Sequence, residues 1–149
     1  MFTADQLVAH LVGDYILQSD WMAENKTKRF LPAAIHASLY SALFLIFRPS
    51  RAAFAVILVS HFFIDRYRLA RYLVWAKNWI GPYFGPVEIN MGGVYQDRQW
   101  RRRNPTKDFA ECAATGYPPE RPIWLAVWLL ILADNILHIC INGFALKFL

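Results

Sequence analysis

The sequence predicts an all-α protein, an integral membrane bundle of four helices with a cytoplasmic insert between helices three and four. Of its 149 residues, 56% are hydrophobic and 16% aromatic, which exceeds the usual range for a soluble domain, and only 18% are charged. The charged residues lie mainly between four apolar stretches that meet or approach the length of a membrane-spanning helix. A soluble bundle is the weaker alternative, because so short a chain cannot hide four apolar helices from water.

The four apolar stretches are expected to form one membrane domain, residues 1–149. The helices are expected over about residues 3–22, 31–47, 52–79 and 122–146, with the insert at 81–121. The last helix is the clearest, because Asp134 is its only charged residue between Ile123 and Leu146. The first and third reach the roughly 20 residues of a spanning helix only if their His and Asp residues lie inside the membrane. Gly and Pro punctuate the insert, which predicts turns and a short helix near 105–114.

The distribution of positive charge predicts the orientation of the helices. Thirteen of the sixteen Lys and Arg residues fall in the first and third connections, which share one side if four helices cross the membrane. The positive-inside rule assigns that side to the cytoplasm, with both termini outside. The run Arg101, Arg102 and Arg103 fits a basic surface near anionic lipid, or alternatively a group that holds a substrate phosphate or headgroup. The net charge of +5 follows from this distribution, so the lipid bilayer is the expected partner and nucleic acid is not.

Polar residues recur at a spacing of four inside the apolar stretches. Three pairs show this spacing: His10 with Asp14, His61 with Asp65, and Asp134 with His138. Positions i and i+4 share one face of a helix, so each pair points in one direction. The order is reversed in the last helix, which also runs in the opposite direction, so all three Asp residues are expected on the cytoplasmic side of their His partners. These side chains are expected to converge in one polar cluster between the helices.

Further polar residues extend this set. His36 joins from the second helix, about five residues from its cytoplasmic end, whereas His138 lies about sixteen residues from the corresponding end of its own helix. At 1.5 Å per residue, the two cannot lie at the same depth unless the helices tilt or are staggered. The other additional candidates are Gln18, Lys26 and Asn135.

Ionisable groups at membrane depth cost roughly 2.5–3.5 kcal/mol each and therefore need partners. A divalent metal, a proton or ion path, and hydrogen bonds between helices are three explanations that the sequence leaves open. Metal is the favoured hypothesis, since imidazole and carboxylate suit zinc, with manganese or iron as alternatives. The expected ligands are His10, His61, Asp65 and His138. Asp14 and Asp134 are the expected catalytic groups, which either orient a ligand or act as general base.

The opening "HLVGDYILQSDWMAENK" resembles the first motif of a family of small integral membrane proteins of bacteria and phages, catalogued as domain of unknown function 3307. Its H-x-x-x-D-x-x-x-Q and M-A-x-x-K elements correspond to His10, Asp14, Gln18, Met22 and Lys26. The central H-x-x-x-D and late D-Q/N-x-x-H elements correspond to His61, Asp65, Asp134, Asn135 and His138. The resemblance covers nearly the whole chain apart from the insert. It implies a membrane fold and brings no established activity.

The polar set is also loosely similar to the sites of membrane-bound metal-dependent hydrolases and of membrane zinc amidases of the ceramidase type. We therefore expect a metal-dependent hydrolase of the bacterial inner membrane, multi-pass with both termini periplasmic. It would act on a lipid or lipid-linked substrate from the cytoplasmic side, using a water activated by the metal. Two other classes stay open. One is a small channel or holin-like factor that acts as a homo-oligomer, and the other is a membrane scaffold that binds a partner through residues 81–121.

Overall fold

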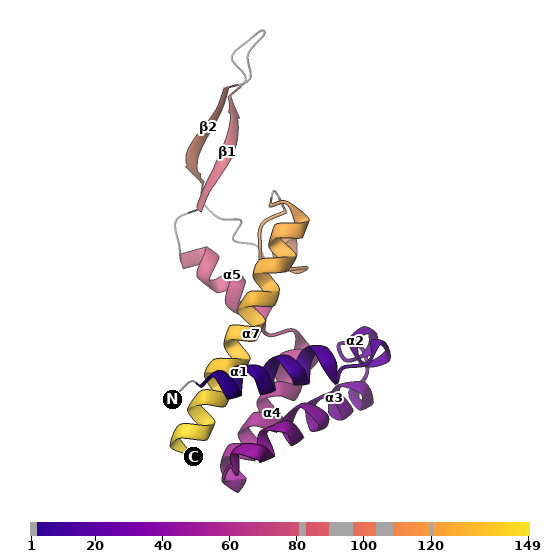
Figure 1. Cartoon of the computed structure of the whole chain (residues 1–149). Helices are drawn as coiled ribbons and strands as arrows, with labels where there is room; N and C mark the ends of the chain where they lie inside the picture. The colour runs from indigo at the N-terminus through magenta and orange to yellow at the C-terminus, as the bar shows by residue number, and fades with distance from the viewer. Residues whose placement is uncertain (1–2, 81–82, 90–96, 104–108, 120) are drawn as a thin grey trace. The chain divides into compact units, whose positions relative to one another are not determined.

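The computed structural model describes residues 3–80, 83–89, 97–103, 109–119 and 121–149 (Figure 1). The chain is mainly helical, as predicted, and falls into two compact units. The first unit comprises Met1–Ala70 with Ile131–Leu149, and the second comprises Arg71–Leu130. The expectation of a single domain over residues 1–149 stays a prediction.

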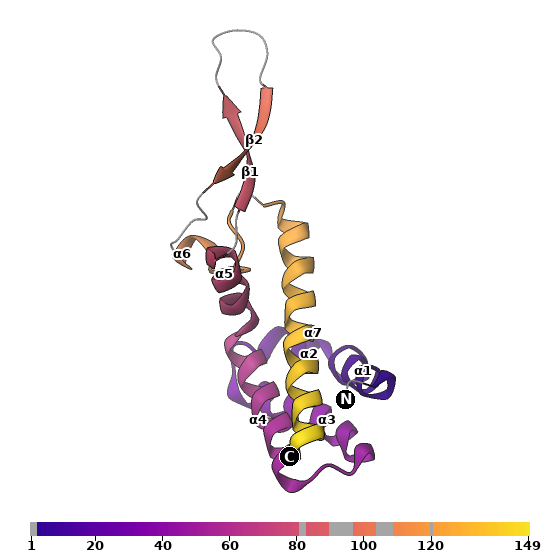
Figure 2. The same ribbon diagram turned by 90° about the vertical axis from the view of Figure 1, so that its left-hand side faces the viewer.

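The first unit is built from helices joined by short connections. These are α1 (Ala4–Leu11), the π-helical turn η1 (Val12–Ile16), α2 (Asp20–Asn25), α3 (Phe30–Leu43), the 3-10 turn η2 (Phe44–Phe47), α4 (Arg51–Tyr67) and the C-terminal part of α7 (Ile123–Phe148). Hydroxyl groups of Thr3, Ser19 and Ser50 cap α1, α2 and α4 by accepting a backbone N–H bond. Helix α3 packs along α4, and α2 and η1 also contact α3. Figure 2 shows the same helices from the side.

The first apolar stretch does not form the single helix predicted over residues 3–22. Helix α1 ends at Leu11, and η1 follows with a hydrogen bond of 3.0 Å from the Leu17 N–H to the Val12 carbonyl. The chain then leaves the helical conformation at residues 17–19. The Ser19 hydroxyl accepts a bond from the Met22 N–H, so a new helix begins at Asp20.

The third stretch is also divided, and the prediction of one helix over residues 52–79 is wrong. Helix α4 ends because Arg68 adopts the left-handed conformation, with φ of 52°. The N–H groups of Arg68 and Leu69 bond back to the carbonyls of Asp65 and Ile64, which closes the helix end. Helix α5 (Ala70–Ile80) follows, and Arg71–Leu130 belong to the second unit.

Two segments match the predicted membrane helices closely. Among the described residues, Phe30–Phe47 and Ile123–Phe148 are long and apolar enough to cross a membrane. The first combines α3 with η2, and the second is α7. Their bounds differ from the predicted 31–47 and 122–146 by no more than two residues.

The first unit has an inverted distribution of polarity. Its interior contains polar side chains: Gln6, His10, Asp14, His36, Ser41, His61, Asp65, His138 and Asn142 are all buried. By contrast, the large apolar side chains Val8, Ile16, Ile46 and Phe144 are each more than half exposed. A soluble domain rarely exposes so much apolar surface around a polar interior, whereas a membrane favours this arrangement.

The second unit contains the predicted insert. It consists of most of α5, the antiparallel strands β1 (Tyr83–Ile89) and β2 (Asp97–Arg103), the short helix α6 (Phe109–Cys112) and the first turns of α7. Helix α6 confirms the short helix expected near 105–114, although residues 104–108 lie outside the described part. The hairpin is a departure from the all-α expectation. Gly85 and Pro86 lie within β1, and these residue types argue against a strand when only the sequence is known.

Arg48, at the end of η2, adopts a left-handed backbone conformation with φ of 50°. Substitutions at this position test whether that conformation strains the backbone. A residue with a Cβ pays roughly 1–2 kcal/mol for this conformation, and glycine does not. Arg48→Gly should therefore be more stable than Arg48→Ala by about 1 kcal/mol. Thermal unfolding in detergent measures the difference, and both variants remove the same charge. Equal unfolding midpoints would show that this position carries no strain.

Candidate metal centre

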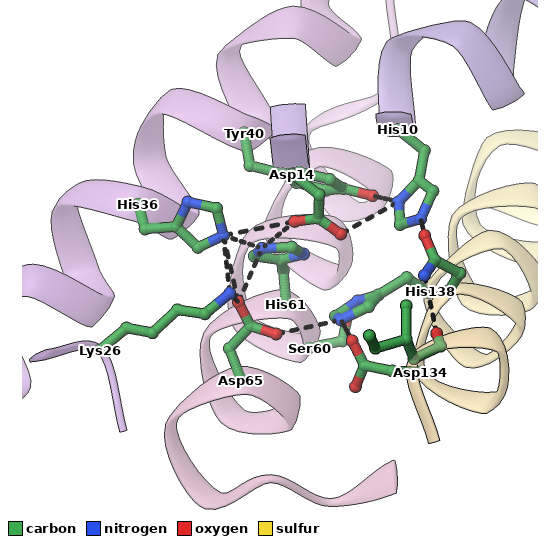
Figure 3. Close-up of polar contacts among 12 residues, drawn as sticks. His10, Asp14, Lys26, His36, Tyr40, Ser60, His61, Asp65, Asp134 and His138 are labelled. Carbon is green, nitrogen blue, oxygen red and sulfur yellow. Dashed lines mark hydrogen bonds and ion pairs between the residues drawn. The ribbon is translucent and has the colours of Figure 1, made fainter. Parts of the chain in front are cut away.

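A buried group of His and Asp side chains lies inside the first unit (Figure 3). Asp14 comes from η1, His36 from α3, and His61 and Asp65 from successive turns of α4. One nitrogen or oxygen from each lies within 4.8 Å of the others. The two His residues are at most 1% exposed, and the two Asp residues at most 8%. These four residues therefore form a group that could hold a metal ion.

The distances within the group match those of ligands around one ion. Nε2 of His36 and Nε2 of His61 lie 3.0 Å apart, and both lie 3.3 Å from Oδ1 of Asp14. Oδ2 of Asp65 lies 3.1 Å from Nε2 of His36 and 3.4 Å from Nε2 of His61. Tetrahedral ligands at 2.0–2.1 Å from Zn²⁺ lie about 3.3–3.4 Å from one another. The four atoms thus have close to the spacing that a shared cation imposes.

Hydrogen bonds alone account poorly for this convergence. Nε2 of His36 has four polar neighbours within 3.5 Å, which belong to Asp14, Lys26, His61 and Asp65. An imidazole nitrogen carries at most one hydrogen, so it can donate to one of them only. Oδ1 of Asp14 is buried and has no hydrogen-bond partner in the part of the chain that the structure describes. A cation shared by the four groups would satisfy all of them at once.

Lys26 places a positive charge at the edge of the group. Its Nζ donates a hydrogen bond of 2.7 Å to Oδ2 of Asp65 and lies 3.5 Å from Nε2 of His36. The Lys26 side chain is 19% exposed, whereas that of Asp65 is 5% exposed. The ammonium group therefore neutralises Asp65 from the more open side. A metal ion that bound Oδ2 would take its place.

Helix α7 contributes His138 and Asp134 to the same cluster. Nε2 of His138 lies 3.2 Å from Oδ1 of Asp65 and 3.6 Å from Oδ2 of Asp134. His36 and His138 thus contact the same carboxylate, and their relative depth in a membrane stays a prediction. The first turns of α7 belong to the second unit, so a residue count from the start of this helix does not measure depth in the first unit.

His10 lies beside the four-residue group, with both ring nitrogens already engaged. The Asn142 side-chain amide donates to the Tyr40 hydroxyl at 2.6 Å, and this hydroxyl lies 2.7 Å from Nδ1 of His10. The hydroxyl proton is therefore directed at Nδ1, and Nε2 of His10 donates to Oδ1 of Asn135 at 2.7 Å. His10 offers no free nitrogen in this arrangement, and His36 and Asp14 stand where His10 was expected among the ligands. Its role as a ligand stays a prediction.

Tyr40 also orients His61. The two rings are stacked, with centroids 3.6 Å apart and planes 15° apart. Nδ1 of His61 is buried without a hydrogen-bond partner among the described residues, although metal-binding histidines usually have one there. The stacked Tyr40 ring thus fixes the plane of the His61 ring where no hydrogen bond to Nδ1 does so. Tyr40 is in turn held close to Gly13, where an added Cβ would come within 2.5 Å of Cδ2 of the Tyr40 ring.

The remaining predicted residues differ in their relation to the site. Asn135 holds His10, while Oε1 of Gln18 is buried without a hydrogen-bond partner in the described part of the chain. Arg101, Arg102 and Arg103 lie on β2, and their side chains fall outside the described part, so their contact with a phosphate or headgroup stays a prediction. Sequence reasoning missed Tyr40 and Asn142. Both continue the spacing of four, after His36 and His138, which was the available signal.

The first unit has an apolar exterior and a buried His and Asp group that could hold a metal ion, and two helices among the described residues are long and apolar enough to cross a membrane. The chain belongs to the family described as "Protein of unknown function (DUF3307)", whose sequence model matches residues 2–83. The match includes the four residues that we call the first metal group, Asp14, His36, His61 and Asp65, and it ends before Asp134 and His138. No curated protein and no solved structure gave a match.

Substitutions of Tyr40 separate its two contributions. Tyr40→Phe keeps the ring over His61 but leaves His10 and Asn142 without their shared partner, so stability should fall by about 1–3 kcal/mol. Zn²⁺ affinity should change little. Tyr40→Leu also removes the stacked ring and should weaken Zn²⁺ binding by about 10–100-fold. Thermal unfolding and Zn²⁺ titration of the purified variants measure both effects. If Tyr40→Leu bound Zn²⁺ as tightly as Tyr40→Phe, stacking would not be what orients His61.

Proposed function

We propose that this protein is a metal-dependent hydrolase of the bacterial inner membrane that acts on a lipid or lipid-linked substrate. The observation that carries the proposal is the convergence of two imidazole nitrogens and two carboxylate oxygens inside a unit with an apolar exterior. Distances of 3.0–3.4 Å between these atoms favour a small divalent cation. Zinc suits this mixture of ligands best, with manganese and iron as alternatives.

Each charged residue of the cluster has a role in the proposed hydrolysis. A bound divalent metal supplies Lewis acidity and lowers the pKa of a bound water. Asp134, whose side chain is 31% exposed, would accept a proton from the attacking water. Lys26, displaced from Asp65 when a cation binds, would face the negative charge that develops on the substrate.

The apolar exterior supports a substrate that arrives from the bilayer. Exposed apolar side chains surround the first unit, so the molecules in contact with its surface would be lipids. A lipid or lipid-linked compound could then reach the polar cluster laterally. Its polar headgroup would enter the site while its acyl part stayed in the hydrocarbon.

We further propose four membrane crossings, with the insert in the cytoplasm and both termini in the periplasm. In the part of the chain that the structure describes, Phe30–Phe47 and Ile123–Phe148 are the two clear candidates for spans. Helix α4 has 17 residues, at the lower limit for a span. The first crossing would be a broken helix formed by α1, η1 and α2, which membranes tolerate where the non-helical backbone is covered by protein. The excess of Lys and Arg in the first and third connections supports this orientation.

Metal content of the detergent-purified protein tests the proposed site. A metal site loses its ion sharply when one ligand is removed, because the ligands act together. His61→Ala should therefore abolish stoichiometric metal while the protein still inserts and purifies. A set of hydrogen bonds would instead weaken gradually, by about 0.6 kcal/mol per pair. Elemental analysis and Zn²⁺ titration measure the outcome.

Ser60→Ala is the matched control for His61→Ala. The Ser60 hydroxyl donates to the Ile57 carbonyl at 3.3 Å, and the residue points about 100° away from His61 on the same helix. Its metal content should equal that of the wild type. A wild-type protein that carries no stoichiometric metal and binds none on titration would overturn the hydrolase proposal. The channel and scaffold hypotheses would then remain.

Reporter fusions test the proposed orientation. A reporter fused at Leu149 should lie in the periplasm, where alkaline phosphatase is active. A reporter fused near Arg102 should lie in the cytoplasm, where green fluorescent protein is fluorescent, because positively charged loops are retained there. Paired alkaline phosphatase and green fluorescent protein reporters at each position give opposite signals. A cytoplasmic C-terminus would exclude four crossings with this orientation.

A further inference from the structure

The two carboxylate oxygens of Asp65 face different sets of groups (Figure 3). Oδ2 accepts a hydrogen bond of 2.7 Å from Nζ of Lys26 and lies 3.1 Å from Nε2 of His36 and 3.4 Å from Nε2 of His61. Oδ1 lies 3.2 Å from Nε2 of His138, which belongs to another helix. The Asp65 side chain is only 5% exposed, so both oxygens are committed to protein groups. A carboxylate placed in this way has the geometry of a bridge between two cations.

The side chains around Oδ1 of Asp65 form a second group that could hold a metal ion. Asp65, Asp134 and His138 each offer one ligand atom, and these atoms lie within 4.8 Å of one another. Nε2 of His138 lies 3.6 Å from Oδ2 of Asp134, a distance that is long for a hydrogen bond. It is close to the spacing of about 3.3–3.4 Å between two ligands of one zinc ion.

The two groups differ in how completely protein atoms surround them. The first offers four protein ligands, which is the composition of a closed site. The second offers three, and its Asp134 side chain is 31% exposed, so a fourth position is open. Three protein ligands with an open position are typical of a catalytic metal site.

We propose that the cluster binds two divalent metal ions, bridged by Asp65. The inference rests on the proposed function, in which one ion is held by the first group. The first ion is enclosed by Asp14, His36, His61 and Oδ2 of Asp65. The second is held by Asp134, His138 and Oδ1 of Asp65, and its open position receives the substrate. With two ions bound, Asp134 is therefore a metal ligand and no longer the group that accepts a proton from the attacking water. The second ion would supply Lewis acidity to an oxygen of the hydrolysed ester at this open position, and the enclosed first ion would hold Asp65 in place.

Charge indicates which substrates such a centre would accept. The three carboxylates and Lys26 together carry a formal charge of about −2 when ionised, so one divalent ion balances them. A second ion leaves the centre positive within an apolar unit. An anionic substrate group compensates this excess, which points to a phosphate ester or another anionic headgroup rather than a neutral amide.

The competing explanation is a single ion, with His138 as a hydrogen-bond donor that orients Asp65. In that case Asp134 would touch no metal. The experiment therefore compares wild type with Asp134→Asn, which keeps the size of the side chain and removes its charge. Ser60→Ala serves as the control outside both groups, and Mn²⁺ serves as the probe because it reports on neighbouring ions by electron paramagnetic resonance.

At saturating Mn²⁺, the wild type and Ser60→Ala should bind two ions per chain, and the resonance spectrum should show a magnetically coupled pair. Asp134→Asn should bind one ion and lose the coupling. One uncoupled ion per wild-type chain would overturn the two-metal inference and leave the proposed function intact. No ion in the wild type would overturn both. The spectrum of the wild type alone decides the matter if Asp134→Asn fails to fold.

Discussion

The loss of hydration by charged groups is the constraint on which the first unit depends. An ionisable group in apolar surroundings costs several kcal/mol unless it is paired, and this unit places three carboxylates among apolar helices. Asp65 meets the constraint by sharing its oxygens among His36, His61, His138 and Lys26. Because His36 and His138 come from other helices than Asp65, a shift of α3 or α7 would remove one of its partners. The polar cluster thus fixes helix positions in the way that an apolar core does in water.

The same constraint extends to the polar groups that bear no charge. Tyr40, Asn142 and Asn135 enclose His10 in a chain of hydrogen bonds with fixed donors and acceptors. This chain decides which tautomer His10 adopts and holds the ring that stacks on His61. A buried network is stabilising only when its members are satisfied, so each of these side chains supports the geometry of the next.

Much of the cluster could be predicted from the sequence, because the spacing of four determines which side chains share a helix face. That rule identified His61 with Asp65 and Asp134 with His138. It could not predict that Tyr40 and Asn135 engage the nitrogens of His10, since contacts between distant segments leave no periodic signal. Nor could it locate the helix ends at residues 17–19 and at Arg68. Local capping bonds and a left-handed backbone conformation determine those ends, and apolar composition is continuous across them.

The π-helical turn η1 determines the direction in which the side chains of α1 point. A π turn contains one residue more than an α turn, so it changes the angular phase of the residues before it by about 100° relative to the residues after it. An α-helix through all five residues Val12–Ile16 would rotate His10 away from Tyr40 without altering either side chain. Deleting one of these residues would instead convert the π turn into an α turn and leave His10 at nearly its present angle. The orientation of α1 therefore depends on the π conformation of this turn as well as on the residues in it.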